Sequence, residues 1–408
     1  MPIADRPILN GWLALDRGRI AAVGRPGASL PIRGDAPLVD LGSFAILPAL
    51  TNSHVHLELS WLHGQVPRAT AFTRWVASML ERRFEAAPPP EQIGVSIDRA
   101  IDQMRRSGTG LVGDISNTLA TVMPLRASAL DGIVFHEVLR LRAEGADALL
   151  EASLRAQEEH GTTGRFPVSV VPHAPYSVSP QLFQGLRSAA SRTPFLPASV
   201  HVGESPEEVE LLETGDGEWR ALLQRLGAWD DNWVPPQCRP AQYLDQMRVL
   251  DSRLLAVHCV QCDDEELETL RARGCTLVTC PRSNEYVGVG SPPVSRFYRS
   301  GVRVAVGTDS LASNDDLNLF AELARMRALA PEIAPERLLA SATWEGARAL
   351  GFEATAGTLE PGKTAALIAI ALPSDCVDVE EHLVSGVSSD RVHWVDDLIA
   401  DCGLRIAD

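Results

Sequence analysis

The segment TNSHVHLELS, residues 51–60, places two histidines and a glutamate at alternating positions of an otherwise apolar run. Side chains of a strand alternate between its two faces, so His54, His56 and Glu58 are predicted to share one face. Two imidazoles on one strand face can converge on a single divalent ion. A pair of buried, hydrogen-bonded histidines is the alternative, and this pattern alone does not decide between the two.

Further polar residues stand near the ends of other apolar runs. They are His173, His201, His258 and Asp309, with Glu204 three residues after His201. A buried polar group without a partner costs ~2–7 kcal/mol, so several such groups need a common explanation. If the fold brings them together, they form a site for a metal ion and for acid–base chemistry.

The elements that must position these residues alternate in type along the chain. Eight short apolar runs are predicted to be strands: 51–58, 110–115, 132–138, 167–173, 197–202, 254–259, 275–280 and 302–309. Amphipathic stretches between them predict helices, among them 92–106, 142–159, 206–226 and 263–273. Eight strand–helix units predict an α/β fold, a closed (β/α)8 barrel of the TIM type. Active sites of such barrels lie at the C-terminal ends of the strands, where the polar residues fall.

The two ends of the chain differ from its middle. Residues 1–49 hold short strand-like pieces around glycine turns, and another such piece lies within residues 358–372. We therefore predict a barrel over residues 50–357, beside one small β domain built from residues 1–49 and 358–408.

Residues 357–364 read GTLEPGKT and match the phosphate-loop pattern. A phosphate loop follows a strand and opens a helix, whereas here the preceding segment looks helical and the following one looks like a strand. We therefore predict a turn in place of a nucleotide site. The turn would hold Lys363, the only lysine of the chain, away from the barrel mouth. Lysine-based catalysis and a lysine that bridges two metal ions are then excluded.

Glu204 is predicted to lie at a strand-to-helix corner. Gly203 can turn the chain there, and Ser205, Pro206 and Glu208 form a helix start with an N-cap residue and proline at the first helical position. A carboxyl group held at such a corner is suited to shuttling a proton.

Composition limits the class of partner. Thirty-seven basic and 53 acidic residues give a net charge of −16 over 408 residues, which argues against nucleic acid or an anionic membrane as the main partner. No apolar run approaches the ~18 residues that cross a bilayer, and the N-terminus lacks the pattern of a signal peptide. We expect a cytoplasmic protein with a small-molecule substrate; the oligomeric state, including a homo-oligomer, is left open.

Seven cysteines, an odd number in a long chain, do not indicate a disulfide framework. Cys259 and Cys262 form a CxxC pair, with Cys275 and Cys280 following. A zinc ribbon needs two tight pairs in turns, whereas Cys259 and Cys280 end apolar runs. Buried, reduced cysteines are the prediction.

Together the motifs resemble the amidohydrolase superfamily, and within it the branch of mononuclear-metal deaminases and chlorohydrolases of amino-substituted heterocycles. The resemblance spans essentially the whole chain and rests on HVH at 54–56, PHAPYSVS at 172–179, HVGE at 201–204, VHC at 257–259, CPRSN at 280–284 and GTDSLASNDDLNLF at 307–320. The HVHLELS and GTDSLASN stretches look most like aminodeoxyfutalosine deaminases.

The resemblance implies roles for individual residues. The implied ligands of the metal ion are His54, His56, His201 and Asp309. Glu204 and His258 are implied to be catalytic, with Asp309 also acting as a base, and His173 is placed against the substrate. Because residues 167–173 contain no lysine, one ion per chain is expected. Zinc is the first expectation for that ion, and iron(II) suits the same ligands.

The implied reaction is hydrolytic deamination of an adenine-type nucleoside derivative such as aminodeoxyfutalosine. Metal-bound hydroxide attacks the carbon that carries the amine, and ammonia is released. Deamination of S-adenosylhomocysteine, methylthioadenosine or guanine is an alternative, as is hydrolysis of another leaving group by a chlorohydrolase or cyclic amidase. A catalytically silent binding or scaffold barrel is a further alternative, although all four ligands are present.

Glu58 lies beyond the expected ligands and is predicted to point into the substrate pocket. It would accept hydrogen bonds from a sugar hydroxyl or ring substituent, with His173 on the opposite wall. The alternative is an ion pair with a loop arginine such as Arg68.

Overall fold

The computed structural model describes residues 3, 6–28, 37–191 and 196–402. Eight parallel strands form two four-stranded sheets, ordered β4-β5-β6-β7 and β8-β9-β10-β11. They are β4 (Leu50–Val55), β5 (Thr109–Ser116), β6 (Asp131–Val138), β7 (Val168–Pro172), β8 (Ala198–Val202), β9 (Leu254–His258), β10 (Thr276–Thr279) and β11 (Arg303–Val306). Each overlaps one of the eight predicted runs, so the predicted series of strands is confirmed.

Hydrogen bonds at the C-terminal ends of the strands join the two sheets into one barrel. At the β7/β8 junction the backbone N–H of His201 donates to the carbonyl of His173 at 2.8 Å. At the other junction the N–H groups of Thr308 and Asp309 donate to the carbonyl of His54 at 3.2 and 3.1 Å. The residues that close the barrel are therefore the same residues that carry the polar side chains.

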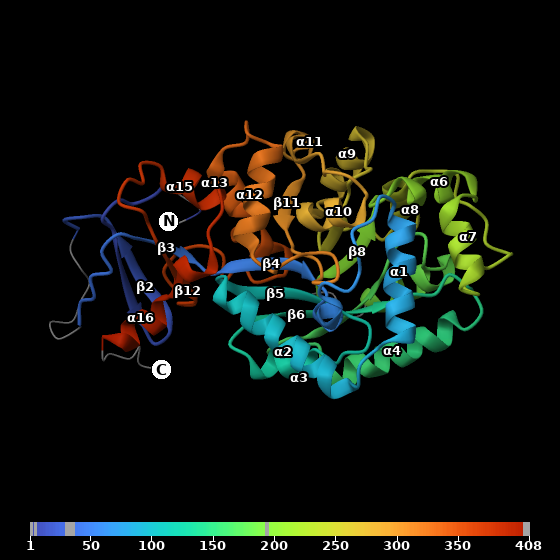
Figure 1. The fold of residues 1–408 in the computed structure, drawn as a ribbon, viewed down its shortest axis with the longest axis horizontal. Helices are drawn as coiled ribbons and strands as arrows, with labels where there is room; N and C mark the ends of the chain where they lie inside the picture. The colour runs from blue at the N-terminus through green and yellow to red at the C-terminus, as the bar shows by residue number, and fades with distance from the viewer. Residues whose placement is uncertain (1–2, 4–5, 29–36, 192–195, 403–408) are drawn as a thin grey trace.

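Helices surround the barrel, with α2, α3 and α4 on one side of the strands and α9 to α13 on the other (Figure 1). Those that follow the first four strands are η1 (Leu57–Leu62), α1 (Phe72–Glu85), α2 (Pro90–Arg106), α3 (Val122–Ala127), α4 (Ala146–His160) and α5 (Pro180–Ala190). The second half contributes α6 (Pro206–Thr214), α7 (Glu218–Arg225), α8 (Pro240–Gln246), α9 (Asp264–Arg273), α10 (Pro281–Val287), α11 (Val294–Ser300), α12 (Leu319–Leu329), α13 (Pro335–Ser341) and α14 (Trp344–Ala349). No helix of the described residues is long and apolar enough to cross a bilayer.

The predicted helix over 206–226 is wrong in its length. It is two helices, α6 and α7, because Gly215 ends α6 in the left-handed conformation with φ 76°. Its predicted start is confirmed, since the Ser205 side chain accepts the N–H of Glu208 and Pro206 takes the first helical position.

A small β domain adjoins the barrel and contains segments from both chain ends (Figure 1). A hairpin pairs β1 (Trp12–Asp16) with β2 (Arg19–Gly24). A second antiparallel sheet has the order β13-β12-β3, from β3 (Phe44–Pro48), β12 (Leu367–Ala371) and β13 (Val392–Trp394). The C-terminal segment also holds α15 (Val379–Val384), η2 (Ser389–Arg391) and α16 (Val395–Asp401). The expected small β domain from both ends is therefore present, with helices added to its C-terminal part.

The GTLEPGKT segment joins α14 to β12, the reverse of the order in a phosphate loop. Lys363 is buried there, where its ammonium donates to the Thr358 hydroxyl and lies 3.0 Å from Glu360. The predicted helix–turn–strand order is confirmed. All seven cysteines are free, and the four in the CxxC region are buried, as predicted.

Candidate metal centre and active site

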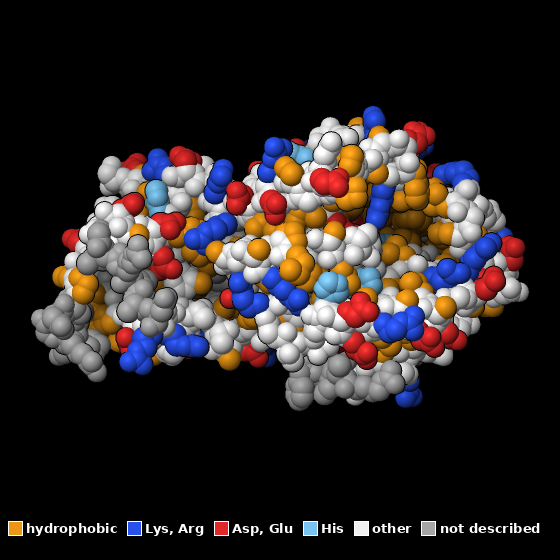
Figure 2. Space-filling view, turned by 90° about the horizontal axis from the view of Figure 1, so that it is seen from below, with side chains coloured by type: hydrophobic (Ala, Val, Ile, Leu, Met, Phe, Trp, Pro, Cys, Tyr) orange, Lys and Arg blue, Asp and Glu red, His pale blue; other side chains and the backbone are white. Residues whose placement is uncertain are grey.

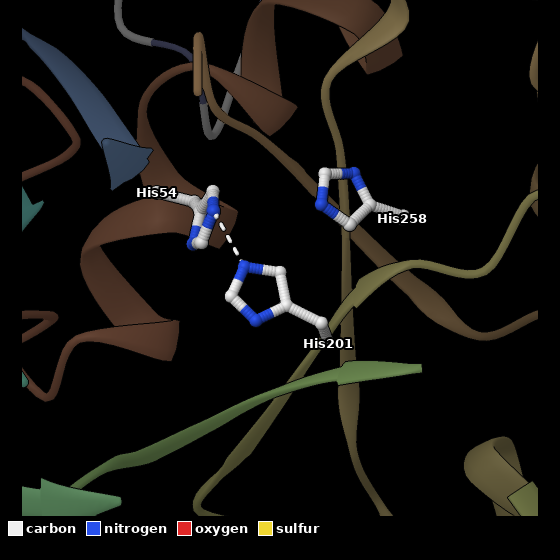
Figure 3. A group of neighbouring side chains, drawn as sticks. All are labelled: His54, His201 and His258. Atoms are coloured by element: carbon white, nitrogen blue, oxygen red, sulfur yellow. Dashed lines mark hydrogen bonds between the residues drawn. The ribbon is translucent and has the colours of Figure 1, made fainter. Parts of the chain in front are cut away.

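Three imidazoles and one carboxylate converge at the barrel mouth. His54 Nε2 lies 3.3 Å from His201 Nε2 and 4.0 Å from Asp309 Oδ1, and His56 Nε2 lies 3.7 Å from that oxygen. Tetrahedral ligands at Zn–N distances of ~2.0–2.1 Å stand ~3.3 Å apart. Figure 3 shows His54 and His201 directed at one another. His54 therefore belongs to two groups of donors spaced for a metal ion, one with His56 and Asp309 and one with His201 and His258.

The protonation states of these groups suit a metal ion. Burial lowers the pKa of His54, His56 and His201, so their rings are neutral at pH 7 and offer lone pairs. Burial alone would raise the pKa of Asp309, but its surroundings, His56 foremost, bring that pKa to about 2. The donor set is therefore three neutral imidazoles and one anionic carboxylate.

Asp309 is fixed by its backbone and by hydroxyl groups. It follows β11 in the left-handed conformation with φ 56°, so it no longer lies on a strand. The hydroxyl of Ser283 donates to Oδ2 at 2.6 Å, and the N–H of Ser310 donates to Oδ1 at 2.7 Å. These bonds orient the carboxylate, so little reorganisation is needed to hold an ion.

The approach of β4 to β11 depends on Gly307. A Cβ atom there would lie 2.6 Å from the carbonyl oxygen of His54, a contact that real side chains do not make. Next to it, the Asn52 side chain donates to the Thr308 hydroxyl at 2.8 Å and accepts the Thr308 N–H at 3.1 Å. β4, which carries His54, and the segment after β11, which carries Asp309, are thereby joined side by side.

Glu204 and His258 form a buried pair beside the histidines. His258 Nε2 lies 3.5 Å from Glu204 Oε1, and the Asn284 amide donates to His258 Nδ1 at 3.0 Å. Neutral His258 therefore carries its proton on Nε2, toward Glu204. Burial, with Asp309 second, raises the pKa of Glu204, and burial lowers that of His258 to about 4. Gly203 turns the chain with φ 58°, as expected.

His258 and His173 border the converged donors on two sides. The ring nitrogens of His258, His54 and His201 lie within 4.8 Å of one another, so His258 faces the candidate ion site (Figure 3). The His173 ring lies 4.9 Å from that of His201, and its Nδ1 lies 2.6 Å from the Ser177 hydroxyl. Burial lowers the pKa of His173 to about 3.

Glu58 does not share a strand face with the two histidines, so that part of the prediction is wrong. The strand ends at Val55, His56 caps the 3-10 helix η1, and Glu58 lies within η1. Oε2 of Glu58 accepts the hydroxyls of Ser116 and Thr118 at 2.7 and 2.9 Å, and Oε1 accepts the N–H of Asn117 at 2.7 Å.

The alternative prediction, an ion pair between Glu58 and Arg68, is not what the structure shows. Arg68 pairs with Asp315 instead, with Nη2 3.3 Å from Oδ2.

Glu137 is a site residue that sequence reasoning missed. It lies on β6, is buried, and places Oε1 3.3 Å from Nδ1 of His201, while the Asn117 amide donates to Oε2 at 3.0 Å. Burial raises the pKa of Glu137 to about 8, against the lowering effect of the Asn117 hydrogen bond. Its sequence signal was a charged residue in the run GIVFHEV.

Known proteins are similar to this chain in sequence. An aminodeoxyfutalosine deaminase of Deinococcus radiodurans is 32% identical over 316 residues, which cover 75% of this chain and 73% of the relative. A 5-methylthioadenosine/S-adenosylhomocysteine deaminase of Moorella thermoacetica is 30% identical over 418 residues, covering 97% of this chain and 90% of the relative.

Two solved structures share the fold. The aminofutalosine deaminase of Helicobacter pylori in complex with methylthio-coformycin has a TM-score of 0.79 at 26% identity, covering 91% of this chain and 90% of its own. An adenosine deaminase of Xanthomonas campestris with bound zinc has a TM-score of 0.79 at 25% identity, covering 93% of this chain and 85% of its own. Residues 45–395, most of the chain, match the amidohydrolase family. This protein belongs to the amidohydrolase family.

Proposed function

We propose that the chain is a metal-dependent hydrolytic deaminase of an adenine-type nucleoside derivative, with aminodeoxyfutalosine as the first candidate substrate. The observation that carries the proposal is the convergence of His54, His56, His201 and Asp309 beside the Glu204–His258 pair. Relatives named as aminodeoxyfutalosine and methylthioadenosine/S-adenosylhomocysteine deaminases support the substrate class. Because of the name of the second relative, methylthioadenosine and S-adenosylhomocysteine are the alternative candidate substrates.

Zinc is the proposed ion, supported by the zinc in the related adenosine deaminase and by the donor set. A divalent ion held by the four ligands would act as a Lewis acid and make a water molecule acidic at neutral pH. Iron(II) suits the same ligands and stays the alternative.

The protein's own residues supply the proton transfers. Asp309, a carboxylate at neutral pH, accepts a proton from the attacking water. Glu204 has a raised pKa, so it holds a proton that it can donate to the ring nitrogen of the base. His258 donates a hydrogen bond from Nε2–H to the oxygen on which charge develops. The proton taken by Asp309 passes to the amine, which leaves as ammonia, and the proton of the added hydroxyl group returns to Glu204. His173 lines the substrate side of the site.

The surface is consistent with a small-molecule partner. On the face drawn in Figure 2, basic side chains lie among acidic ones, and a hollow edged by hydrophobic side chains opens between them. The cytoplasmic location and the absence of nucleic-acid and membrane partners stay predictions, and the oligomeric state stays open.

A panel of aminated nucleosides assayed for ammonia tests the proposed function. Aminodeoxyfutalosine, methylthioadenosine, S-adenosylhomocysteine, adenosine and guanine would be compared by kcat/KM. We expect the highest value for an adenine nucleoside with a large 5′ substituent. Release of chloride from a halogenated heterocycle, with no ammonia from any nucleoside, would contradict the proposal.

Glu58→Gln is expected to retain one ion per chain and to lower kcat/KM. The expected loss of transition-state stabilisation is ~1.5–3 kcal/mol, the scale of a hydrogen bond to a charged group. The proposed reason is that Oε1 accepts a single N–H, from Asn117, and so can accept a second donor from the substrate. Measurement on deoxy analogues decides the point. If the mutant and the wild type lose equally on every analogue, Glu58 holds the 116–118 turn and does not contact the substrate.

A further inference from the structure

His201 can bind an ion through Nε2 only if its other ring nitrogen, Nδ1, carries the proton. Nδ1 faces two acceptors, the carbonyl oxygen of His173 at 3.1 Å and Oε1 of Glu137 at 3.3 Å. The His173 carbonyl can only accept a hydrogen bond, so Nδ1 is the donor and the protonated nitrogen. The lone pair of Nε2 is then directed at the candidate ion site, where His54 Nε2 lies 3.3 Å away.

The Glu137 carboxylate is itself oriented by a neighbouring turn. The side-chain amide of Asn117 donates to Oε2 of Glu137 at 3.0 Å and to its backbone carbonyl at 3.1 Å. The backbone N–H of Asn117 donates in turn to Glu58 at 2.7 Å. Hydrogen bonds therefore run from η1, through the turn after β5, to Glu137, whose Oε1 lies 3.3 Å from Nδ1 of the imidazole on β8.

We propose that Glu137, oriented by Asn117, is a positioning residue that fixes the orientation and proton of His201 for metal binding. The inference rests on the proposed metal site. A carboxylate on the far nitrogen of a metal-binding imidazole raises the basicity of the ligand, and losing such a partner typically costs ~10–100-fold in metal affinity. The His173 carbonyl contacts Nδ1 from one direction only, and Oε1 of Glu137 adds a second contact that fixes the orientation of the ring.

The grouping of Glu137, His173 and His201 also permits a rival assignment. Their ligand atoms lie within 4.8 Å of one another, so Glu137 could be a ligand of a second ion. That assignment requires a His201 ring that carries no proton and binds one ion through each nitrogen. The carbonyl of His173 accepts a hydrogen bond from Nδ1, so Nδ1 keeps its proton. The geometry favours a positioning role.

The test measures zinc affinity directly, by equilibrium competition with a chromophoric chelator. Glu137→Gln is expected to weaken zinc binding by ~10–100-fold with the stoichiometry still at one. Asn117→Ala keeps the backbone N–H that binds Glu58 and removes only the amide. It should weaken binding less, and the double variant should bind like Glu137→Gln alone, because Asn117 acts through Glu137. The visible spectrum of the cobalt(II)-loaded variants should change with the orientation of His201.

Glu345→Gln is the control, since Glu345 lies on α14 and is not part of this network. It should bind zinc like the wild type.

If Glu137→Gln does not fold, the zinc affinity of Asn117→Ala is the test, because Asn117 is only half-buried. Equal zinc affinity in Glu137→Gln and the wild type would overturn the positioning role, as would a second ion that only the wild type binds. A wild-type chain that binds no ion would overturn the metal site itself, whereas absence of ammonia release with tight zinc binding would overturn only the proposed reaction.

Discussion

Removal of the metal ion by a strong chelator is expected to lower ammonia release by at least ~10³-fold, and one equivalent of zinc per chain should restore it. A Lewis acid supplies several kcal/mol of transition-state stabilisation, and each 1.36 kcal/mol is tenfold in rate. The stoichiometry follows from the four converged donors and from the place of Lys363, which lies in the small β domain and cannot bridge a second ion. Elemental analysis after each step gives the number of ions per chain.

The chelator saturated with zinc beforehand is the control, and it should leave the rate unchanged. The ion should also raise the temperature of unfolding, because a ligand at ~1,000 times its Kd stabilises the folded state by about 4 kcal/mol. Full activity in the metal-free protein would contradict the metal-dependent reaction. A requirement for two equivalents would contradict the single-ion site.

The eight strands were predictable because their signal is local. Each barrel strand is a short apolar run followed by a helix-length segment, and this alternation indicates parallel strands whatever lies between them. The placement of His54, His201 and His258 followed, because the C-terminal ends of parallel strands meet at one end of a barrel. Their gathering at the barrel mouth was therefore expected, and the structure adds that their ligand atoms lie within 4.8 Å of one another.

The face of Glu58 was not predictable, because alternation applies only while the strand continues. The chain leaves β4 at Val55, where the backbone N–H of Leu57 donates to Asp114 at 3.0 Å. Asp114 belongs to the neighbouring strand β5 and is 57 residues away in sequence. A contact between distant residues ends the strand, and the local pattern HVHLE contains no sign of it.

Glu137 was missed for a related reason. It stands in the run GIVFHEV next to His136, and two adjacent polar residues in one strand face opposite sides. The pattern does not indicate which of them faces the barrel interior. Ser283 and Asn284, which hold Asp309 and His258, lie in a helix after β10 and were identified only as part of a motif. Residues that orient other residues have no spacing rule, because their partners come from other elements.

Glu204→Gln is expected to lower the rate of deamination by ~10²–10⁴ while the zinc content stays at one. Glutamine keeps the shape of the side chain but cannot give a proton to the ring nitrogen or take it back. Glu204 is 3% exposed, and burial raises its pKa and so favours its uncharged form. The neutral amide should therefore cost little free energy of unfolding, which separates the effect on rate from an effect on stability.

Glu210→Gln is the matched control, because Glu210 lies on the same helix, α6, is exposed, and is not among the groups that shift the pKa of Glu204. Its rate should stay within about threefold of wild type, as is usual for a carboxylate outside the chemistry. Single-turnover measurements of ammonia release at saturating substrate would place the loss in kcat, since proton donation occurs in the transition state and not on binding. An active Glu204→Gln enzyme would mean that another group is the general acid. His258, whose Nε2 lies 3.5 Å from Glu204, would then be the next residue to test. Loss of zinc together with activity would instead mean that Glu204 supports the ligands, because a proton shuttle has no part in holding the ion.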